Sequence, residues 1–241
     1  MRRLSFPDGS EQEFADDISG VDVATHISPG LAKRAIGYRL DDELRDLDRP
    51  IERDGAIRIV TATDDDPDAL YLLRHSAAHV LAEAVCDLLP GTKLAYGPPV
   101  EDGFYYDMAT PRPVTTEDFA AIEERIQLIV KQRRPFTRVG CGREAGFARV
   151  GEDKYKRDNA ERALERGAEE LSFYVTGTPG DDWEDLCAGP HVPHTGFLAH
   201  TKVMNVAGAY WHGDHTSDRL TRIYGTCFAD KKSLKRHLQR L

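Results

Sequence analysis

Apolar residues recur at intervals of three and four between residues 69 and 89, which is the spacing of one face of an α-helix. The acidic segment Thr63-Asp-Asp-Asp-Pro67 precedes this run, so Asp66 is the expected N-cap and Pro67 the expected first helical residue. Pro90 and Gly91 end the run. The pattern predicts a long helix and, just before it, a boundary between two parts of the chain.

The first 62 residues have the short alternating patterns of a small mixed unit. Pro7-Asp-Gly-Ser10 has turn chemistry and separates two alternating segments, which is typical of a β-hairpin. The expected strands are 4–6, 11–14, 38–40 and 56–60, and the expected short helices are 21–27 and 31–35. A hairpin, a helical part and returning strands within about 60 residues predict a β-grasp fold.

The remainder, residues 63 to 228, mixes amphipathic helices with strand-like pieces. Besides the long helix, helices are expected at 116–132, 143–149 and 153–170, strands at 93–96, 103–107, 136–141, 202–206 and 220–224, and an apolar segment at 171–175. A last helix, capped by Asp230, is expected within 229–241. The chain is therefore predicted to be α+β, with one domain over 1–62, a larger one over 63–228 and the start of a further helix at 229–241.

Composition narrows the class of protein. No segment reaches the roughly 18 to 20 consecutive apolar residues of a membrane span, and the N-terminus lacks the apolar core of a signal peptide. The four cysteines are far apart and form no CxxC pair, so we expect reduced thiols rather than a disulfide framework. These features predict a soluble, cytoplasmic protein without a membrane partner.

Net charge bears on nucleic acid as a partner. A formal net charge of -9 argues against binding by bulk electrostatics, because phosphate binding requires clustered Lys and Arg. Positive charge concentrates only at the C-terminal end, where residues 230–241 hold five Lys or Arg against one Asp. A solvated helix face or a linker helix accounts for this cluster.

Two histidine motifs could carry chemistry. His75 and His79 are four residues apart in the expected long helix, which places both imidazoles on one face. Cys187 and His191 form a CxxxH in a segment that Gly and Pro keep from being helical, and such a pair can bind zinc or act as nucleophile and base. A buried cysteine beside a surface histidine is the simpler interpretation of the second motif. Together, however, the motifs supply the three nitrogens and one sulfur of a tetrahedral zinc site.

Other polar groups could serve the same site. Lys156 could hold a phosphate or a water, although a charged run of this kind is usually a solvated helix face. Tyr105 and Tyr106 could present a hydroxyl, although aromatic residues on a hairpin are more often part of a core.

The order of several motifs resembles bacterial threonyl-tRNA synthetases. The motifs are His75-Ser-Ala-Ala-His79, Gly97-Pro-Pro-Val-Glu-Asp-Gly-Phe-Tyr-Tyr-Asp107, Asp185-Leu-Cys-Ala-Gly-Pro-His-Val-Pro193, Ala207-Gly-Ala-Tyr-Trp211 and Arg222-Ile-Tyr-Gly-Thr226. The opening Pro7-Asp-Gly-Ser10, with Ser28-Pro-Gly-Leu-Ala-Lys33, resembles the TGS domain that begins the same enzymes. The resemblance covers nearly the whole chain and implies a TGS domain over 1–62 and an editing domain over 63–228.

The resemblance also implies what the chain should and should not do. Alanyl-tRNA synthetases and free-standing alanyl-tRNA editing proteins share the editing domain in outline, and the TGS domain ahead of HxxxH points to the threonyl family. Residues 229–241 resemble the start of the helix that leads to the synthetic core. That core is absent from this chain, so we expect neither productive ATP binding nor aminoacylation.

The implied reaction is hydrolysis of serine wrongly attached to tRNA(Thr), recognised mainly at its 3′-terminal adenosine. Serine lacks one methyl group of threonine, and a methylene-sized difference is worth only about 1 to 3 kcal/mol, or roughly 10- to 200-fold. A pocket that accepts threonine therefore admits serine, and a second site that refuses threonine is needed to remove the error.

Site roles follow from the same resemblance. The residues carried over as lining the editing pocket are His75, His79, Cys187, His191, Lys156 and Tyr106. We expect His75 and Lys156 to place and activate a water, and, on charge complementarity alone, we expect Asp185 to bind the serine ammonium. Lys154, one position before Tyr155, is a rival to Lys156.

Zinc and two other functions stay open at this stage. Alanyl-type relatives hold zinc with the same four residue types as His75, His79, Cys187 and His191, whereas the threonyl resemblance implies an editing site that requires no metal. The chain could instead be a non-catalytic tRNA-binding or regulatory module, because TGS domains also occur outside synthetases. A zinc-stabilised structural domain is the remaining alternative.

Overall fold

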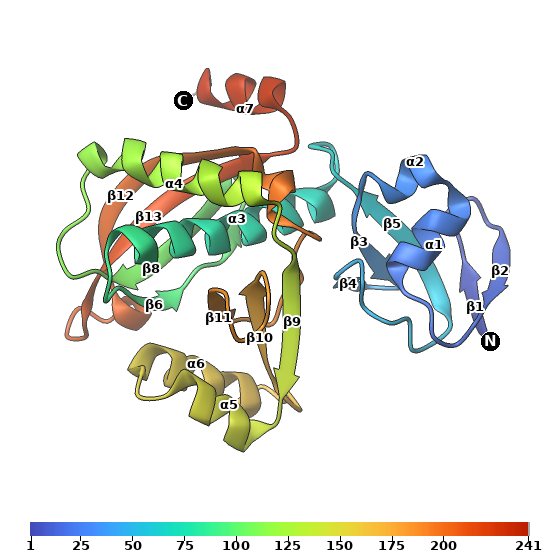
Figure 1. Ribbon diagram of the computed structural model, residues 1–241, viewed down its shortest axis with the longest axis horizontal. Coiled ribbons are helices and arrows are strands. Elements are labelled where there is room, and N and C mark those ends of the chain that lie inside the picture. The colour runs from blue at the N-terminus through green and yellow to red at the C-terminus, as the bar shows by residue number, and fades with distance from the viewer. Residues whose placement is uncertain (241) are drawn as a thin grey trace. The chain divides into compact units, whose positions relative to one another are not determined.

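The computed structural model describes residues 1–240, and their contacts form two compact units (Figure 1). The first unit is built mainly from Met1–Leu73, and the second mainly from Arg74–Ala188 and His194–Cys227. Both units combine helices with sheets, so the predicted α+β class is confirmed. Within residues 1–240 we find no helix whose length and apolar content would let it cross a membrane.

The first unit has the β-grasp arrangement that the sequence predicted. Its strands are β1 (Arg2–Ser5), β2 (Glu11–Phe14), β3 (Ala35–Leu40), β4 (Glu43–Arg45) and β5 (Gly55–Thr61), in the order β2-β1-β5-β3-β4. The neighbouring strands β1 and β5 run parallel, and the other pairs are antiparallel. Helix α1 (Gly20–Ile27) contributes Val23 to a core with Leu4, Tyr38 and Ile57.

One serine sets the boundary between the two short helices of this unit. Ser28 ends α1, and its hydroxyl accepts a hydrogen bond from Leu31 N at 3.1 Å to cap α2 (Pro29–Ala32). The second helix therefore begins two residues earlier than predicted, with Pro29 in its first turn. It also ends earlier, because Ala35 already belongs to β3.

The long helix predicted from periodicity is α3 (Pro67–Leu88). Its start is the predicted one, because Asp66 Oδ1 accepts a hydrogen bond from Asp68 N at 3.0 Å. Residues 72–85 are buried on every side of the helix. A helix buried all round is a core element, and any polar side chain on it must find partners inside the protein.

The second unit contains two antiparallel sheets. The larger has the order β12-β13-β8-β6, and the smaller has the order β11-β10-β9. The strands are β6 (Lys93–Tyr96), β7 (Pro99–Val100), β8 (Gly103–Ala109), β9 (Phe136–Cys141), β10 (Leu171–Thr176), β11 (Glu184–Leu186), β12 (His200–Tyr210) and β13 (Arg219–Phe228). In Figure 1, α3 and α4 (Phe119–Gln132) run across the larger sheet.

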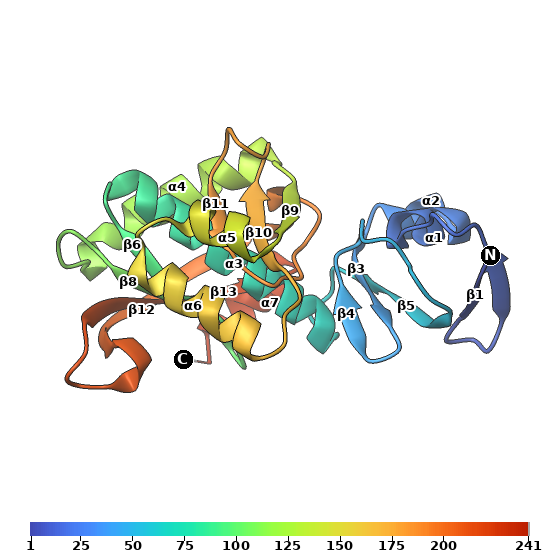
Figure 2. The ribbon, with the colours of Figure 1, turned by 90° about the horizontal axis from the view of Figure 1, so that it is seen from below.

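Two further helices of the second unit accompany the smaller sheet. Helices α5 (Arg143–Val150) and α6 (Lys154–Glu165) lie beside β10, as Figures 1 and 2 show. The predicted helix 153–170 is too long, because Gly167 has a φ of +96° that breaks the helical path. The predicted helix 116–132 is confirmed, although its first turn, Thr116–Asp118, is a 3₁₀ turn. Asp230 caps the last helix, α7 (Lys231–Leu238), as expected, and this helix groups with the first unit rather than the second.

Candidate functional site

Two histidines of α3 lie side by side in the buried core of the second unit. The ring centroids of His75 and His79 are 5.5 Å apart, and the rings are almost perpendicular. Both side chains are buried. The helical spacing of four therefore places two imidazoles together, away from bulk solvent.

Cys187 meets this pair from the end of β11. Its Sγ atom is 3.3 Å from His75 Nε2. The Cys187 backbone is fixed at both polar groups, because its N–H donates to Ser172 O at 3.0 Å and its carbonyl accepts from Ser172 Oγ at 2.6 Å. Strand β10, which carries Ser172, thus fixes the position of the Cys187 thiol beside the His75 imidazole.

The two sequence motifs meet in one donor set. One ligand atom from each of His75, His79, Cys187 and His191 lies within 4.8 Å of the others. Three imidazole nitrogens and one thiolate are ligands that zinc accepts in tetrahedral sites, at about 2.0 to 2.3 Å from the metal. The chemistry of this donor set therefore fits zinc.

A second buried group joins Lys156, Tyr106 and Asp185. The Lys156 ammonium forms an ion pair with Asp185 Oδ1 and lies 3.2 Å from the Tyr106 hydroxyl, which donates to Asp185 Oδ2. The three residues come from α6, β8 and β11, and all are at least nine-tenths buried. Burial, together with the charge of Asp185, raises the pKa of Tyr106 well above its ordinary value, so its hydroxyl keeps its proton.

Lys154 is not part of this group. Its side chain is more than half exposed and forms an ion pair with Asp218. Lys156 is therefore the lysine that contacts Asp185, whereas its rival lies on the surface of the same helix.

Lys156 of the second buried group affects the pKa of His79 in the first. Burial lowers the pKa of His79 well below its ordinary value, and electrostatic interaction with His75 and with Lys156 lowers it further. His79 is therefore neutral near pH 7. Phe136 and Trp183 present their rings to His79 at centroid distances of 6.4 and 5.8 Å, which adds to its apolar surroundings.

Three contributors to this site carried no clear signal in the sequence. Gly97 leaves room for the Tyr106 ring, which a Cβ at this position would overlap. Trp183 is two residues before Asp185, and its contact with His79 depends on a fold that places α3 beside the smaller sheet. Cys86 follows His79 by seven residues, and burial raises the pKa of its thiol to about 11. Only the helical spacing of Cys86 from His79 could have suggested its proximity.

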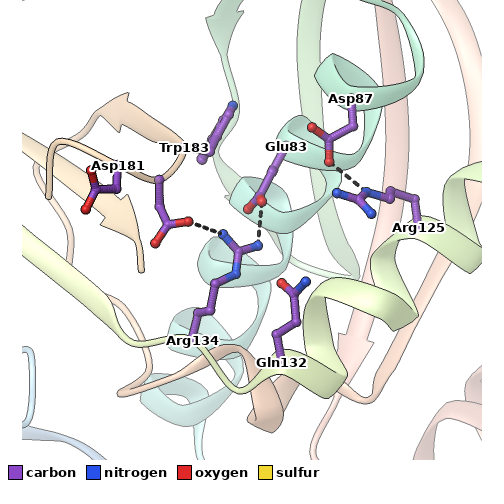
Figure 3. A pocket seen from close by; sticks show the side chains of 8 residues that line it. Glu83, Asp87, Arg125, Gln132, Arg134, Asp181 and Trp183 are labelled. Carbon is purple, nitrogen blue, oxygen red and sulfur yellow. Dashed lines mark hydrogen bonds and ion pairs between the residues drawn. The ribbon is translucent and has the colours of Figure 1, made fainter. Parts of the chain in front are cut away.

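A polar pocket of about 410 Å³ adjoins Trp183 and is separate from the two buried groups (Figure 3). Its arginines are paired with acids: Arg134 contacts Glu83 at 2.5 Å and Asp182 at 3.7 Å, and Arg125 contacts Asp87 at 2.7 Å. The lining consists of Glu83, Asp87, Arg125, Gln132, Arg134, Asp181, Asp182 and Trp183. Because carboxylates outnumber guanidinium groups here, the pocket does not favour an anion such as phosphate.

Comparison with protein families finds two matches within the chain. Residues 1–61 match the TGS domain, and residues 174–224 match the threonyl and alanyl tRNA synthetase second additional domain. The second match contains Asp185, Cys187 and His191, while the histidines of α3 lie before it.

Relatives with high identity match the whole chain. The threonine–tRNA ligase of Hyphomonas neptunium is 44% identical over 100% of this chain, and that of Bartonella bacilliformis is 46% identical over 99% of it. The threonine–tRNA ligase of Maricaulis maris is 45% identical over 100% of the chain. The aligned regions cover 36%, 35% and 37% of these three relatives. The chain thus spans about a third of the length of the curated relatives it matches.

Proposed function

This chain corresponds to the N-terminal region of threonine–tRNA ligases, and on that premise we propose that it hydrolyses serine from mischarged tRNA(Thr). The observation that carries the proposal is the buried group of Lys156, Asp185 and Tyr106 beside His75 and His79. Burying a lysine and a carboxylate costs stability unless they are well paired, so such groups are concentrated at functional sites.

The reaction requires few components. A water attacks the ester carbonyl carbon, the bond from this carbon to the ribose oxygen breaks, and the products are free serine and tRNA with a free terminal hydroxyl. The site must take a proton from the water, stabilise the negative charge on the carbonyl oxygen and return a proton to the ribose oxygen.

The side chains of the site have the chemical groups that these steps require. We assign His75 to position the water and accept its proton, and Lys156 to hold the water and to stabilise the developing negative charge. Asp185 is the candidate partner of the serine ammonium, because it is the carboxylate of the buried group. Tyr106 holds Asp185 through its hydroxyl and keeps the carboxylate oriented.

The remaining residues shape the pocket in this assignment. His79 is neutral near pH 7, so it can donate or accept a hydrogen bond without adding a charge next to Lys156. Cys187 and His191 complete the wall, and the thiol has no nucleophilic role. Selection of serine over the larger threonine requires a small site, and buried side chains that pack closely around the substrate would provide one.

The donor set of His75, His79, Cys187 and His191 would hold zinc if the ion were present. When bound, zinc would supply a Lewis acid that polarises a carbonyl or activates water. We propose that editing by this chain needs no metal, because Lys156 and His75 already supply a positive charge and a base.

Exchange of each lysine separately tests the assignment. We expect Lys156→Ala to lower the rate of seryl-tRNA(Thr) deacylation by on the order of 100-fold, because removal of one electrostatic stabiliser typically costs that much. Lys154→Ala is the matched control, since it removes an exposed lysine two residues away and should change the rate less than about threefold. Equal losses in the two variants would remove Lys156 from the mechanism.

A non-catalytic tRNA-binding module would give a different result in the same assay. Such a module would bind tRNA(Thr) and leave the seryl ester intact in the wild-type chain and in both variants.

A further inference from the structure

Helix α6 is attached to the turn that joins β12 to β13, which we call the 211–218 turn. The hydroxyl of Tyr155 donates to Asp218 Oδ2 at 2.7 Å, and the Trp211 ring meets the Tyr155 ring edge-on at a centroid distance of 5.1 Å. Tyr155 is almost fully buried and packs with Ala95 and Leu220 of the larger sheet. The first turn of α6 is thus fixed on its outer side by the 211–218 turn.

Further contacts continue this attachment along the helix. His212 Nε2 lies 2.9 Å from Asp158 Oδ2, which also accepts from Arg162 Nε at 2.8 Å. Asn159 Nδ2 donates to Ala95 O at 2.6 Å and ties the helix to β6. The helix therefore has several points of contact with the sheet and its turn, and little freedom to rotate.

Lys156 follows Tyr155 directly but points into the buried group with Asp185 and Tyr106. Consecutive residues of a helix point about 100° apart, so a rotation that moves Tyr155 moves the Lys156 stem as well. Asp153 caps both residues, because its Oδ1 accepts from Tyr155 N at 3.0 Å and from Lys156 N at 3.2 Å. A lysine stem has high rotamer entropy, so a fixed helix turn is needed to hold the ammonium in one place.

We propose that Asp218 is a positioning residue for Lys156: it holds the Tyr155 hydroxyl, fixes the first turn of α6 and so places the Lys156 ammonium in the site. This inference rests on the proposed function, since it adds a residue outside the buried groups to the same reaction. Asp218 does not contact the reacting atoms in this account and acts through Tyr155 alone.

If Asp218 had a purely structural role, its loss would lower kcat only as far as folded protein is lost. The side chain of Asp218 is 37% exposed, and its ion pair with Lys154 is on the surface, where such pairs contribute little to stability. At this partly exposed position water replaces Asp218 as the acceptor for the Tyr155 hydroxyl, so loss of Asp218 should lower the melting temperature only modestly. If Asp218 positions Lys156, the same loss lowers kcat while KM is retained.

Two variants remove the contact from opposite sides, and a conservative variant retains it. Asp218→Ala and Tyr155→Phe both abolish the hydrogen bond, and we expect each to lower kcat for seryl-tRNA(Thr) by about tenfold. The double variant should be no slower than the slower single variant, because both remove one interaction. Asp218→Asn keeps an oxygen that accepts from Tyr155, so it should restore most of the rate. Asp214→Ala, in the same turn, removes only contacts to its own turn and is the control.

A second readout does not depend on catalysis. Reductive ¹³C-methylation of the lysines gives one methyl signal for each side chain, and the Lys156→Arg variant identifies that of Lys156. We expect Asp218→Ala and Tyr155→Phe, but not Asp214→Ala, to shift this signal toward that of solvent-exposed lysines.

A wild-type chain that leaves the ester intact would contradict the proposed function, whereas the Lys156 signal would still test whether Asp218 positions Lys156. Unchanged kcat and an unchanged Lys156 signal in both variants would overturn the inference, as would a fall in kcat matched by loss of folded protein.

Discussion

Glu83 shows how burial changes a single group in this protein. It lies one helical turn after His79, is almost fully buried and contacts Arg134 (Figure 3). Burial outweighs the favourable charge of Arg134 and raises the pKa of Glu83 above its ordinary value of 4.5. The folded state therefore binds this proton more tightly than the unfolded state does. Its contribution to stability is fully present below pH 4.5 and is lost as the pH rises through the raised pKa.

The Glu83→Gln variant tests whether the stability contributed by Glu83 decreases as the pH rises. The glutamine mimics the protonated carboxyl, so we expect the difference in unfolding free energy between variant and wild type to move in favour of the variant as the pH rises above 4.5. Urea unfolding of both proteins at several pH values between about 4 and 8, the range in which a carboxyl with a raised pKa titrates, measures the difference. A difference that stays constant with pH would show that Glu83 ionises as an ordinary carboxyl.

Gly97 controls the position of Tyr106 by having no side chain. We expect Gly97→Ala to cost about 1 to 3 kcal/mol of stability, because the added methyl group would overlap the Tyr106 ring in a packed region. The rate of seryl-ester hydrolysis should fall as well, since Tyr106 holds Asp185. Thermal unfolding and the deacylation assay together measure both effects.

Gly30→Ala is the control for that substitution. The nearest atom to its added methyl group is Ser28 Oγ at 4.0 Å, and the change should stay within about 0.5 kcal/mol. If the two alanine variants proved equally stable and equally active, the close contact between Gly97 and Tyr106 would have no role.

Among elements, α6 and α7 offer a matched pair of helix caps. The carboxylate of Asp153 accepts from two backbone N–H groups of α6, and that of Asp230 accepts from two of α7, at 2.7 and 2.9 Å. We expect Asp153→Ala and Asp230→Ala each to cost about 1 kcal/mol of stability. Only the Asp153 variant should also lower the deacylation rate, because only α6 carries Lys156. Similar rates in both variants would contradict a role for the first turn of α6.

Element by element, periodicity and caps explain what could be predicted. Helix α3 was predictable because its apolar spacing, Asp66 and Pro67 all act locally. Strand β4 was missed because three residues give too short a pattern, and the end of α6 was missed because a single glycine with positive φ determines it. Strands β12 and β13 extend beyond the predicted segments because their exposed polar and glycine positions weaken the alternation.

The residues of the site also fall into two kinds: those predictable from local spacing and those that depend on contacts between distant parts of the chain. The spacing within HxxxH and CxxxH suggested that four ligands meet, and the contacts agree. Lys156 and Tyr106, which are 50 residues apart in the sequence, were carried over from a family resemblance, and Asp185 was chosen by charge complementarity. Trp183 and Asp218 gave no signal, because each acts through a partner that only the folded chain brings near.

For the molecule as a whole, charge sets the conditions under which the function can be measured. The chain has a net charge of -9 and spans about a third of its threonine–tRNA ligase relatives. Because nucleic acids bind mainly through phosphate neutralisation, we expect weak affinity for tRNA from this chain alone. A deacylation assay therefore needs tRNA concentrations at which binding has been shown to saturate.

The central claim is selective hydrolysis of the seryl ester, and its most direct test compares seryl-tRNA(Thr) with threonyl-tRNA(Thr) at saturating tRNA, with and without a chelator. We expect the seryl ester to be hydrolysed at least roughly tenfold faster than the threonyl ester, the lower limit for discrimination by one methyl group. The rate should be the same after chelation. Hydrolysis of neither ester, or of both at equal rates, would contradict the proposed function, and a rate abolished by chelation would place zinc in the site.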